Sequence, residues 1–447
     1  MGKKEYDWHI GETPPVIDLH SVTKHKVYEE YLMHYIEVLN SNPGIPRFNL
    51  TIVDGFSGGG EYLHPDSNEV LEGSPIRMIK AAEAAEALIN IKREKSGVTK
   101  KITISVNHYF IEKKPCNFEY LENSLSERGF VASNGYKIQT INSTFVDEVD
   151  RIITEIKKQK PAGRTLFILD QYGYKDVPFS KIKYIFSQIP NAEVILTFAT
   201  DWLINYMTST PQYKKAFEST GLGEMIDIDE LLENKFDKEE WRRIVQYELH
   251  KAILPLSGAE HYTPFFITSR ESKRSFWLIH LSNHHRARDV MTQLHWKLKN
   301  HFMHYGGHGF KMFGYDPRND SEIVGIEDMF NNTEYSFDEI ALKQTIESVV
   351  GDMPRLINER PDGIRFGDFY KLVANETPAT SDILKKASEI LIDGNEVEVI
   401  SESGSSRRSV NTIKDSDILR IPNQGRLITT SGTSLVEMFR KKKGNKK

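Results

Sequence analysis

The stretch TIVDGFSGGGEY (51–62) decides the fold of this chain. It reads as a β-branched strand with an acid, Asp54, followed by a glycine-rich turn. A tight turn at the carboxyl edge of a sheet needs small residues, because they let backbone amides approach a bound ligand closely. The dinucleotide pattern G-x-G-x-x-G is not met, since Leu63 stands in place of its third glycine. The turn is therefore either a ligand cradle or an ordinary strand-to-helix connection.

Strand and helix patterns alternate around this stretch. Apolar and β-branched runs predict strands at 48–56, 102–112, 137–142, 164–170 and 192–200. Apolar residues at helical spacing predict helices at 22–39, 74–95, 117–128, 147–159 and 179–189. The alternation predicts an α/β fold with a Rossmann-like, mostly parallel sheet and helices on both faces.

The middle of the chain adds further elements to this sheet. Residues 201–258 are helical and polar, which predicts a helical insertion or lid. Two apolar runs, 262–270 and 275–283, are expected to form a hairpin that closes one edge of the sheet. A long helix is then predicted at about 286–303.

The character of the sequence changes after the sheet domain. Two short amphipathic helices, 366–377 and 380–395, precede a strand–turn–strand ribbon. Helix, helix and ribbon in this order predict a winged-helix-like domain. The expected organisation is an N-terminal helical segment, a sheet domain with its insertion, a connection, a winged-helix-like domain and a basic tail, at 1–47, 48–310 (insertion 201–258), 311–360, 361–425 and 426–447.

The composition excludes several classes of protein. Of the 447 residues 39% are hydrophobic, which excludes a disordered chain, and the formal net charge of −5 does not indicate nucleic-acid binding by itself. The single cysteine, Cys116, excludes an intramolecular disulfide framework and favours a reducing compartment. Without a signal peptide or an apolar stretch long enough to span a bilayer, we expect a cytoplasmic protein with no membrane contact. Histidines gather between His284 and His308, but without cysteines or an unbroken helix we expect no metal site.

Polar residues end two further predicted strands. Glu112 ends the second strand, where a carboxylate is placed to accept both ribose hydroxyls of a nucleotide. Its separation from the glycine turn is longer than the usual distance of about 20 residues, because a loop and a long helix intervene. Asn142 ends the third strand and is a candidate partner for adenine. The alternatives are a surface glutamate that leads a helix and a turn-forming asparagine.

The glycine turn also resembles a known motif. The pattern D-x-F-S-G-x-G, formed by Asp54, Phe56, Ser57, Gly58 and Gly60, is similar to the first motif of class I S-adenosylmethionine (SAM) methyltransferases, particularly those that act on nucleic acid. The resemblance implies SAM as the cofactor. It also implies that Asp54 and the glycine backbone hold the methionine half of SAM.

The fourth strand is followed by the tetrapeptide Asp170-Gln171-Tyr172-Gly173. Exocyclic-amine methyltransferases carry a related tetrapeptide, D/N-P-P-Y/F, which accepts a hydrogen bond from the target amine and stacks its ring on a flipped base. Asp170, the carbonyl of Gln171 and the ring of Tyr172 are therefore candidates to orient the acceptor. Gln171 stands where a proline is usual, and the alternative is a generic acid at the sheet edge.

Two basic clusters are candidates for binding a substrate phosphate. The first stands at the start of a predicted helix, whose N-terminus attracts anions, and comprises His284, Arg286 and Arg288. The second lies in the turn of the C-terminal ribbon and comprises Arg407 and Arg408. The segment 361–447 carries 15 Lys and Arg against 12 Asp and Glu, which suits nucleic-acid contacts. The alternatives are an ordinary capped helix and a domain that contacts proteins.

Several short motifs in a fixed order resemble one family, the three-Cys-motif partner proteins (TcmP). They include VDGFSGGGEY (53–62), EGSPIRMI (72–79), FIEKKPCNFEYL (110–121), ILDQYGY (168–174), TFATDW (197–202) and SNHHRARDVM (282–291). The resemblance covers about residues 20 to 425 and implies a methyltransferase-type Rossmann-like domain with a winged helix. It further implies a companion protein with three cysteines, often of radical-SAM type, in bacterial gene neighbourhoods. Family members usually carry Asp-Pro-Tyr/Phe-Gly after the fourth strand, so Gln171 is a departure that bears on catalysis more than on fold.

Two hypotheses about function follow, an enzyme and a non-catalytic binding protein. The first is a SAM-dependent methyltransferase that acts on nucleic acid presented by the winged helix. The second is a non-catalytic partner that binds SAM or a nucleotide as a structural or sensing ligand, while the winged helix docks the companion protein or DNA.

Overall fold

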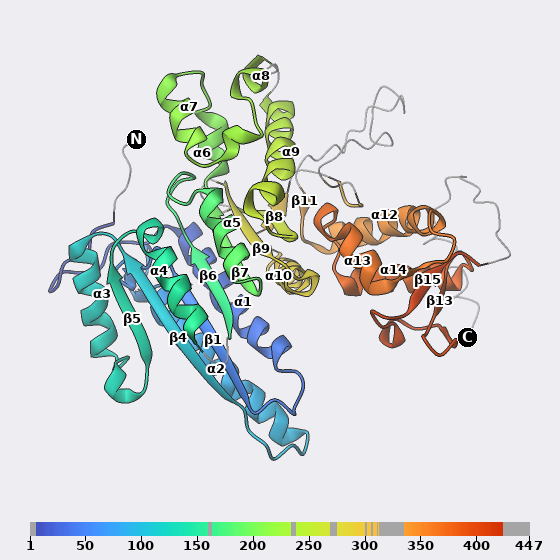
Figure 1. Cartoon of the computed structure of the whole chain (residues 1–447), viewed down its shortest axis with the longest axis horizontal. Helices are drawn as coiled ribbons and strands as arrows, with labels where there is room; N and C mark the ends of the chain where they lie inside the picture. The colour runs from blue at the N-terminus through green and yellow to red at the C-terminus, as the bar shows by residue number, and fades with distance from the viewer. Residues whose placement is uncertain are drawn as a thin grey trace. The chain divides into compact units, whose positions relative to one another are not determined.

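The computed structural model describes residues 6–159, 163–233, 238–268, 275–299, 302–304, 307–310, 312 and 335–422. The chain divides into two compact units, Met1–His304 and Tyr305–Lys447, here called unit 1 and unit 2. Each unit has its own set of buried apolar side chains. Figure 1 shows the chain coloured from the N-terminus to the C-terminus.

Unit 1 is built on a mostly parallel sheet, and the predicted Rossmann-like α/β architecture is present. Its strands follow the order β10-β8-β9-β7-β6-β1-β4-β5. Five neighbouring strands are parallel, namely β1 (Arg47–Asp54), β4 (Thr103–Glu112), β5 (Lys137–Asn142), β6 (Arg164–Leu169) and β7 (Ala192–Phe198). The remaining strands pair antiparallel with their neighbours, namely β8 (His261–Thr268), β9 (Ser275–Ser282) and β10 (Phe302–His304).

Helices cover both faces of this sheet, as the alternation predicts. One face carries α1 (Leu19–Leu39), α2 (Ser74–Lys95), α3 (Pro115–Glu127) and α10 (His285–Lys297). The other carries α4 (Phe145–Lys158) and α5 (Phe179–Gln188), which lie in front of the strands in Figure 1. Every residue of β7 is buried, because a parallel strand in the middle of such a sheet is covered on both sides.

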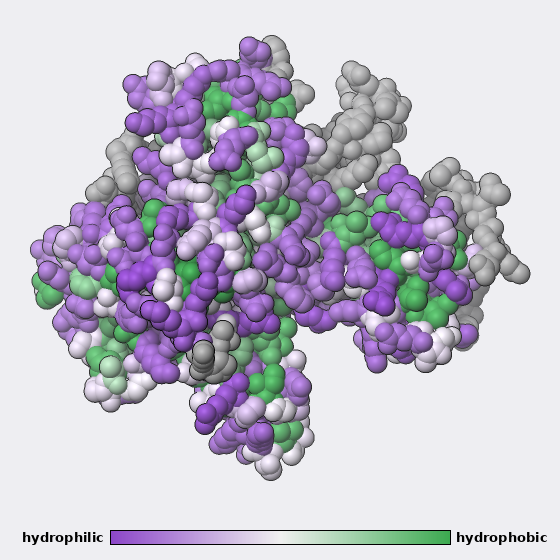
Figure 2. Space-filling model, in the orientation of Figure 1, coloured by the Kyte–Doolittle hydropathy of each residue, from purple (hydrophilic) through white to green (hydrophobic). Residues whose placement is uncertain are grey.

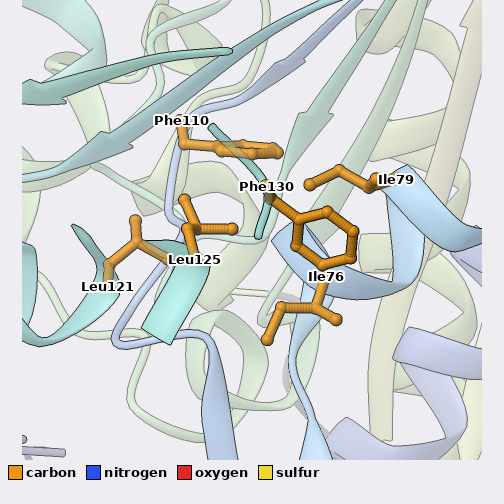
Figure 3. Packing of buried hydrophobic residues seen from close by; sticks show 6 residues of the cluster. All are labelled: Ile76, Ile79, Phe110, Leu121, Leu125 and Phe130. Carbon is orange, nitrogen blue, oxygen red and sulfur yellow. The ribbon is translucent and has the colours of Figure 1, made fainter. Parts of the chain in front are cut away.

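One apolar cluster fixes two helices against β4. Figure 3 shows its side chains, which come from α2, β4, α3 and the loop after α3: Ile76, Ile79, Phe110, Leu121, Leu125 and Phe130. Phe110 is completely buried and precedes the end of β4 by two residues, so it shares a face of the strand with Glu112. The cluster therefore fixes the position of the carboxyl end of β4.

The segment 201–258 is helical, as expected, and contains most of α6 (Thr200–Asn205), with α7 (Pro211–Glu218), α8 (Ile228–Glu233) and α9 (Lys238–Ser257). These helices form one group in unit 1, green to yellow in Figure 1.

Two predictions for the end of unit 1 are wrong. The hairpin of β8 and β9 does not close the edge of the sheet, because β10 pairs with β8 through Phe302 and Ile267. The helix predicted at 286–303 ends at Lys297, and the last two residues of the predicted range, 302 and 303, belong to β10. Here pairing with the sheet outweighs the helical spacing of the sequence.

Unit 2 contains α12 (Glu339–Asn358), β12 (Ile364–Arg365), α13 (Phe366–Val373), α14 (Ser381–Asp393), β13 (Glu398–Ile400), β14 (Ser406–Arg407) and β15 (Ile418–Arg420). The four strands form an antiparallel sheet in the order β12-β15-β13-β14. Much of the expected connection, 311–360, is the long helix α12. The expected basic tail, 426–447, lies outside the described residues.

The outer surface of each unit is mostly hydrophilic on the face shown in Figure 2. Across the described ranges of the chain, no helix is both long enough and apolar enough to cross a lipid bilayer.

Candidate functional site

The carboxyl ends of four parallel strands bring the predicted site residues to one edge of the sheet. Asp54 is the last residue of β1, Glu112 of β4 and Asn142 of β5, and Asp170 follows β6 directly. The strand order reverses between β1 and β6, because the chain adds β4 and β5 on one side of β1 and β6 and β7 on the other. In open α/β sheets ligands bind beyond the carboxyl ends of the strands at such a reversal.

The glycine turn lies against the carboxylate of Glu112. The backbone N–H of Gly58 donates a hydrogen bond to Glu112 Oε2 at 3.0 Å. The N–H of Ser57 donates to the carbonyl of Ile111 at 3.0 Å, so the turn is bound to the end of β4 at two points. Gly58 and Gly60 have φ of +59° and +82°, which explains the need for glycine at both positions. The structure thus brings the turn and Glu112 together.

Asp54 is completely buried beneath this turn. Its Oδ2 accepts a hydrogen bond from Ser74 Oγ at 2.6 Å, and its Oδ1 accepts one from the N–H of Phe56 at 3.1 Å. Burial raises the pKa of Asp54 to about 7, against the lowering effect of these two hydrogen bonds, and the charges of Asp170 and Glu112 raise the pKa further. Asp54 therefore holds the first turn of α2 to the end of β1.

This raised pKa predicts a pH dependence of stability. The folded protein holds the Asp54 proton more tightly than the unfolded chain, so stability falls as pH rises from about 4 towards 7. Between pH 5 and pH 8 the wild type is expected to lose about 2–3 kcal/mol of unfolding free energy relative to Asp54→Asn, which cannot titrate. Urea denaturation of both proteins at the two pH values measures this difference. An equal change in the two proteins would show that Asp54 is ionised throughout this range.

Glu112 joins the turn to the start of α3. Besides Gly58, its carboxylate accepts hydrogen bonds from the backbone N–H of Lys114 at 2.8 Å and from Asn117 Nδ2 at 3.4 Å. A carboxylate offers about four acceptor positions, so one position remains for a ligand hydroxyl. Asn142 Nδ2 donates to the carbonyl of Glu112 at 2.9 Å, so this amide links β5 to β4.

Asp170 forms a buried ion pair that the sequence did not predict. Lys24 Nζ lies 2.5 Å from Asp170 Oδ1, and the two side chains are 8% and 15% exposed. Burial alone would raise the pKa of Asp170, but the charge and hydrogen bond of Lys24 outweigh it and hold the pKa below its usual value. Asp170 is thus an ionised carboxylate whose partner comes from α1.

The two residues after Asp170 play different parts. Gln171 is buried, and its Oε1 accepts hydrogen bonds from the N–H groups of Asp176 and Val177 at 3.0 and 3.1 Å. The side chain of Gln171 therefore closes the loop 171–177, and its Nε2 has no hydrogen-bond partner among the described residues. Tyr172 is 40% exposed, which leaves part of its ring open to a ligand or to solvent.

A cavity of about 180 Å³ lies at this edge of the sheet. Its walls include Gly58, Glu112, Asp170, Gln171 and Tyr172 from the predicted set. They also include residues from the N-terminal segment, α1, β2 (Glu61–Leu63) and β9, namely Tyr6, Trp8, Lys24, His25, Tyr62 and Phe276. None of the described residues in 201–258 lines the cavity, so the expected lid role of that segment finds no support here.

The N-terminal segment covers the glycine turn. Trp8 is 3% exposed, and its Nε1 donates a hydrogen bond to the carbonyl of Glu61 at 2.6 Å. A Cβ on Gly59 would lie 2.4 Å from the Trp8 ring, so this glycine makes room for Trp8. The cavity is smaller than the 300–1,000 Å³ that is typical of small-molecule sites, and Tyr6 and Trp8 are among the side chains that line it.

The first predicted phosphate cluster lies at the opposite edge of the sheet. Strand β9 is antiparallel to β7, and Ser282 at its end pairs with Glu193 at the start of β7. His284 and Arg286 follow this end, so they lie away from the carboxyl edge that holds Asp170. Arg288 is expected from the sequence to bind a substrate phosphate. It is completely buried, so it is not part of an exposed phosphate-binding surface.

The second cluster is divided between two environments. Arg407 Nε lies 3.0 Å from Oδ2 of the buried Asp417, which gives Arg407 a structural ion pair within unit 2. Arg408 is exposed. Residues 361–422 carry 8 Lys and Arg against 11 Asp and Glu, so the excess of positive charge in the C-terminal segment comes from 423–447, outside the described residues.

The comparisons with known proteins give a distant structural similarity. No protein-family model matches the chain, and no curated protein matches it. Among solved structures, the chain is similar to a putative S-adenosyl-L-methionine-dependent methyltransferase from Methanococcus maripaludis, with 11% sequence identity and a TM-score of 0.24. The match covers 61% of this chain and 97% of that one. The geometry of the site carries the functional argument.

Proposed function

We propose that this chain is a SAM-dependent methyltransferase that binds SAM at the carboxyl edge of its sheet. One observation carries the proposal: the N–H of Gly58 donates a hydrogen bond at 3.0 Å to the carboxylate of Glu112, beside the β1–β6 position where the strand order reverses. A glycine turn beside an acid at this place in an α/β sheet is the arrangement that holds a nucleoside and its ribose. The order β5-β4-β1-β6-β7-β9-β8, with its mostly parallel strands, is consistent with a Rossmann-like methyltransferase fold.

The chemistry of the cavity walls fits this cofactor. Carboxylates of Glu112 and Asp170 and the rings of Tyr6, Trp8 and Tyr172 line the space. Aromatic faces and carboxylates stabilise a cationic group, and the sulfonium of SAM is cationic. Glu112 would hold the ribose, and the glycine backbone above Asp54 would hold the methionine end.

Methyl transfer requires alignment more than acid–base catalysis. When bound, SAM supplies an activated methyl group on its sulfonium, so positioning of the acceptor provides most of the acceleration. Asp170 would accept a hydrogen bond from the acceptor amine, and the half-exposed ring of Tyr172 would stack on it. The backbone carbonyl of Gln171 remains a candidate contact, while its side chain holds the loop.

The acceptor in this proposal is a nucleic acid, and the reaction takes place in the cytoplasm with a three-Cys-motif companion protein. The motif resemblance and the basic residues of 423–447 support the nucleic acid. The order α12, β12, α13, α14 and the strands after it support a winged-helix-like unit 2, which would present the substrate. The single cysteine supports a cytoplasmic location, because the cytoplasm is a reducing compartment in which disulfides are rare.

A non-catalytic partner protein is the second candidate. The observation that favours it is the buried pair of Asp170 and Lys24, because a carboxylate already held by a lysine is less available to an acceptor amine. In this case the sheet edge would bind SAM or a nucleotide as a sensing ligand, and unit 2 would dock a protein or DNA.

A methyl-transfer assay separates the two candidates. The full chain is incubated with SAM that carries a radiolabelled methyl group and with DNA, RNA or the companion protein. The proposal expects label in nucleic acid, at least about tenfold reduced by Asp170→Asn, because one hydrogen bond to a charged group is lost. SAM binding with no label in any acceptor would favour the partner protein. Absence of SAM binding would refute the methyltransferase and leave only a partner protein that binds a nucleotide.

A further inference from the structure

The wall of the cavity contains one buried ammonium group. Lys24 lies in α1, its side chain is 8% exposed, and its Nζ contacts Asp170 Oδ1 at 2.5 Å. Lys114 also lines the cavity, but its side chain is 28% exposed and pairs with Asp7. Lys24 therefore differs from Lys114 in being held inside the site.

The adjacent histidine, His25, does not share this charge. His25 follows Lys24 and lines the same cavity, but burial lowers its pKa to about 3, so it is neutral at physiological pH. The centroid of the Phe276 ring lies 5.5 Å from Lys24 Nζ. Lys24 is thus a localised positive charge in a wall that also presents the carboxylates of Glu112 and Asp170.

A buried ion pair has a specific consequence for ligand selection. Removing one partner leaves an uncompensated buried charge, which is strongly unfavourable. A zwitterionic ligand can replace the ion pair of Lys24 and Asp170, because its carboxylate can pair with the lysine and its ammonium group can pair with the aspartate. A ligand without these groups cannot separate Lys24 from Asp170.

We propose that Lys24 binds the carboxylate of the amino-acid group of the ligand, in exchange for Asp170. The inference rests on the proposed function and assigns a specificity to its site. The cavity selects a nucleoside thioether or sulfonium that carries an intact zwitterionic amino acid over one that lacks it. Asp170 released from Lys24 then faces the cationic side of the ligand or the acceptor.

Calorimetry with two nucleosides tests this assignment on the full chain. S-adenosylhomocysteine carries the amino-acid group, whereas 5′-methylthioadenosine has the same nucleoside and thioether without it. Wild type is expected to bind S-adenosylhomocysteine about 30-fold more tightly than 5′-methylthioadenosine. Lys24→Met is expected to weaken the binding of S-adenosylhomocysteine about 30-fold, since a charge-assisted contact is lost. The affinity for 5′-methylthioadenosine should stay within about threefold, because it has no carboxylate for Lys24. Lys26→Met, at a 53% exposed position of α1, is the matched control.

The outcomes separate this inference from the function on which it rests. Equal affinity of wild type for both nucleosides, or an equal loss of both in Lys24→Met, would overturn the role of Lys24 while leaving nucleoside binding in place. If neither nucleoside binds the wild type, the proposed function fails and this inference fails with it. Should Lys24→Met fold poorly by circular dichroism, the double variant Lys24→Met/Asp170→Asn removes both buried charges. The same selective loss is then expected, and its absence contradicts the assignment.

Discussion

Glu112→Gln is expected to weaken the binding of S-adenosylhomocysteine by about 100-fold, which equals about 2.7 kcal/mol. The carboxylate accepts hydrogen bonds from Gly58, Lys114 and Asn117 and keeps one position for a ribose hydroxyl. An amide has a single acceptor oxygen, and its NH2 group would face the N–H of either Gly58 or Lys114. The variant therefore loses the ribose contact and also loosens the turn.

Isothermal titration calorimetry of wild type and Glu112→Gln measures this effect. Glu122→Gln is the matched control, because it makes the same substitution at an exposed position of the adjacent helix α3. Circular dichroism and the melting temperature show whether the variant is folded. A folded Glu112→Gln protein with an affinity within about threefold of wild type would show that Glu112 is only a structural link between the turn and α3.

Phe110→Ala is expected to destabilise unit 1 by about 3–5 kcal/mol, the largest effect on stability that we predict. Phe110 is completely buried where β4 meets α2 and α3 (Figure 3). The substitution removes a ring from a close-packed cluster and leaves a cavity. Because the same strand ends at Glu112 two residues later, the carboxyl edge should also lose its fixed position.

Urea denaturation measures the loss of unfolding free energy in Phe110→Ala. Ile91→Ala is the control, because Ile91 lies on α2 but is 47% exposed, and its replacement should change stability by less than about 0.5 kcal/mol. A loss below about 1 kcal/mol for Phe110→Ala would contradict the packing that places this ring in the core.

The architecture of unit 1 could be predicted because its signals are local. Strand and helix patterns alternate at short intervals, and parallel strands place their carboxyl ends at one edge. That rule alone brings Asp54, Glu112 and Asp170 to the same edge, although up to 116 positions separate them in the sequence. The contact of Gly58 with Glu112 further requires that β1 and β4 be neighbours in the sheet.

The contacts that the sequence did not reveal depend on long-range packing. Lys24 and Asp170 lie 146 positions apart, and no local pattern connects them. A partial signal was present: Lys24, Tyr28 and Tyr31 share one apolar face of α1, and a lysine on such a face needs a buried partner. Trp8 gave no comparable signal, because it precedes the first helix in an irregular segment.

The direction of β9 explains why the candidate phosphate-binding residues His284 and Arg286 do not lie at the carboxyl edge of the sheet. The sequence places His284 and Arg286 directly after a strand, and in an all-parallel sheet they would lie at the same edge as Asp170. Since β9 runs antiparallel to β7, they lie at the other edge. Direction depends on how the β8–β9 hairpin joins the sheet, which apolar periodicity does not encode.

A crystal structure of the full chain grown with S-adenosylhomocysteine tests whether the carboxyl edge of the sheet binds the cofactor. We expect ligand density at the carboxyl edge, with the ribose at Glu112 and the amino-acid group beside Gly58 and Lys24, and with Tyr6 and Trp8 displaced to enlarge the cavity. Density for the ligand elsewhere on the chain, or a cavity that is unchanged at saturating ligand, would contradict this expectation.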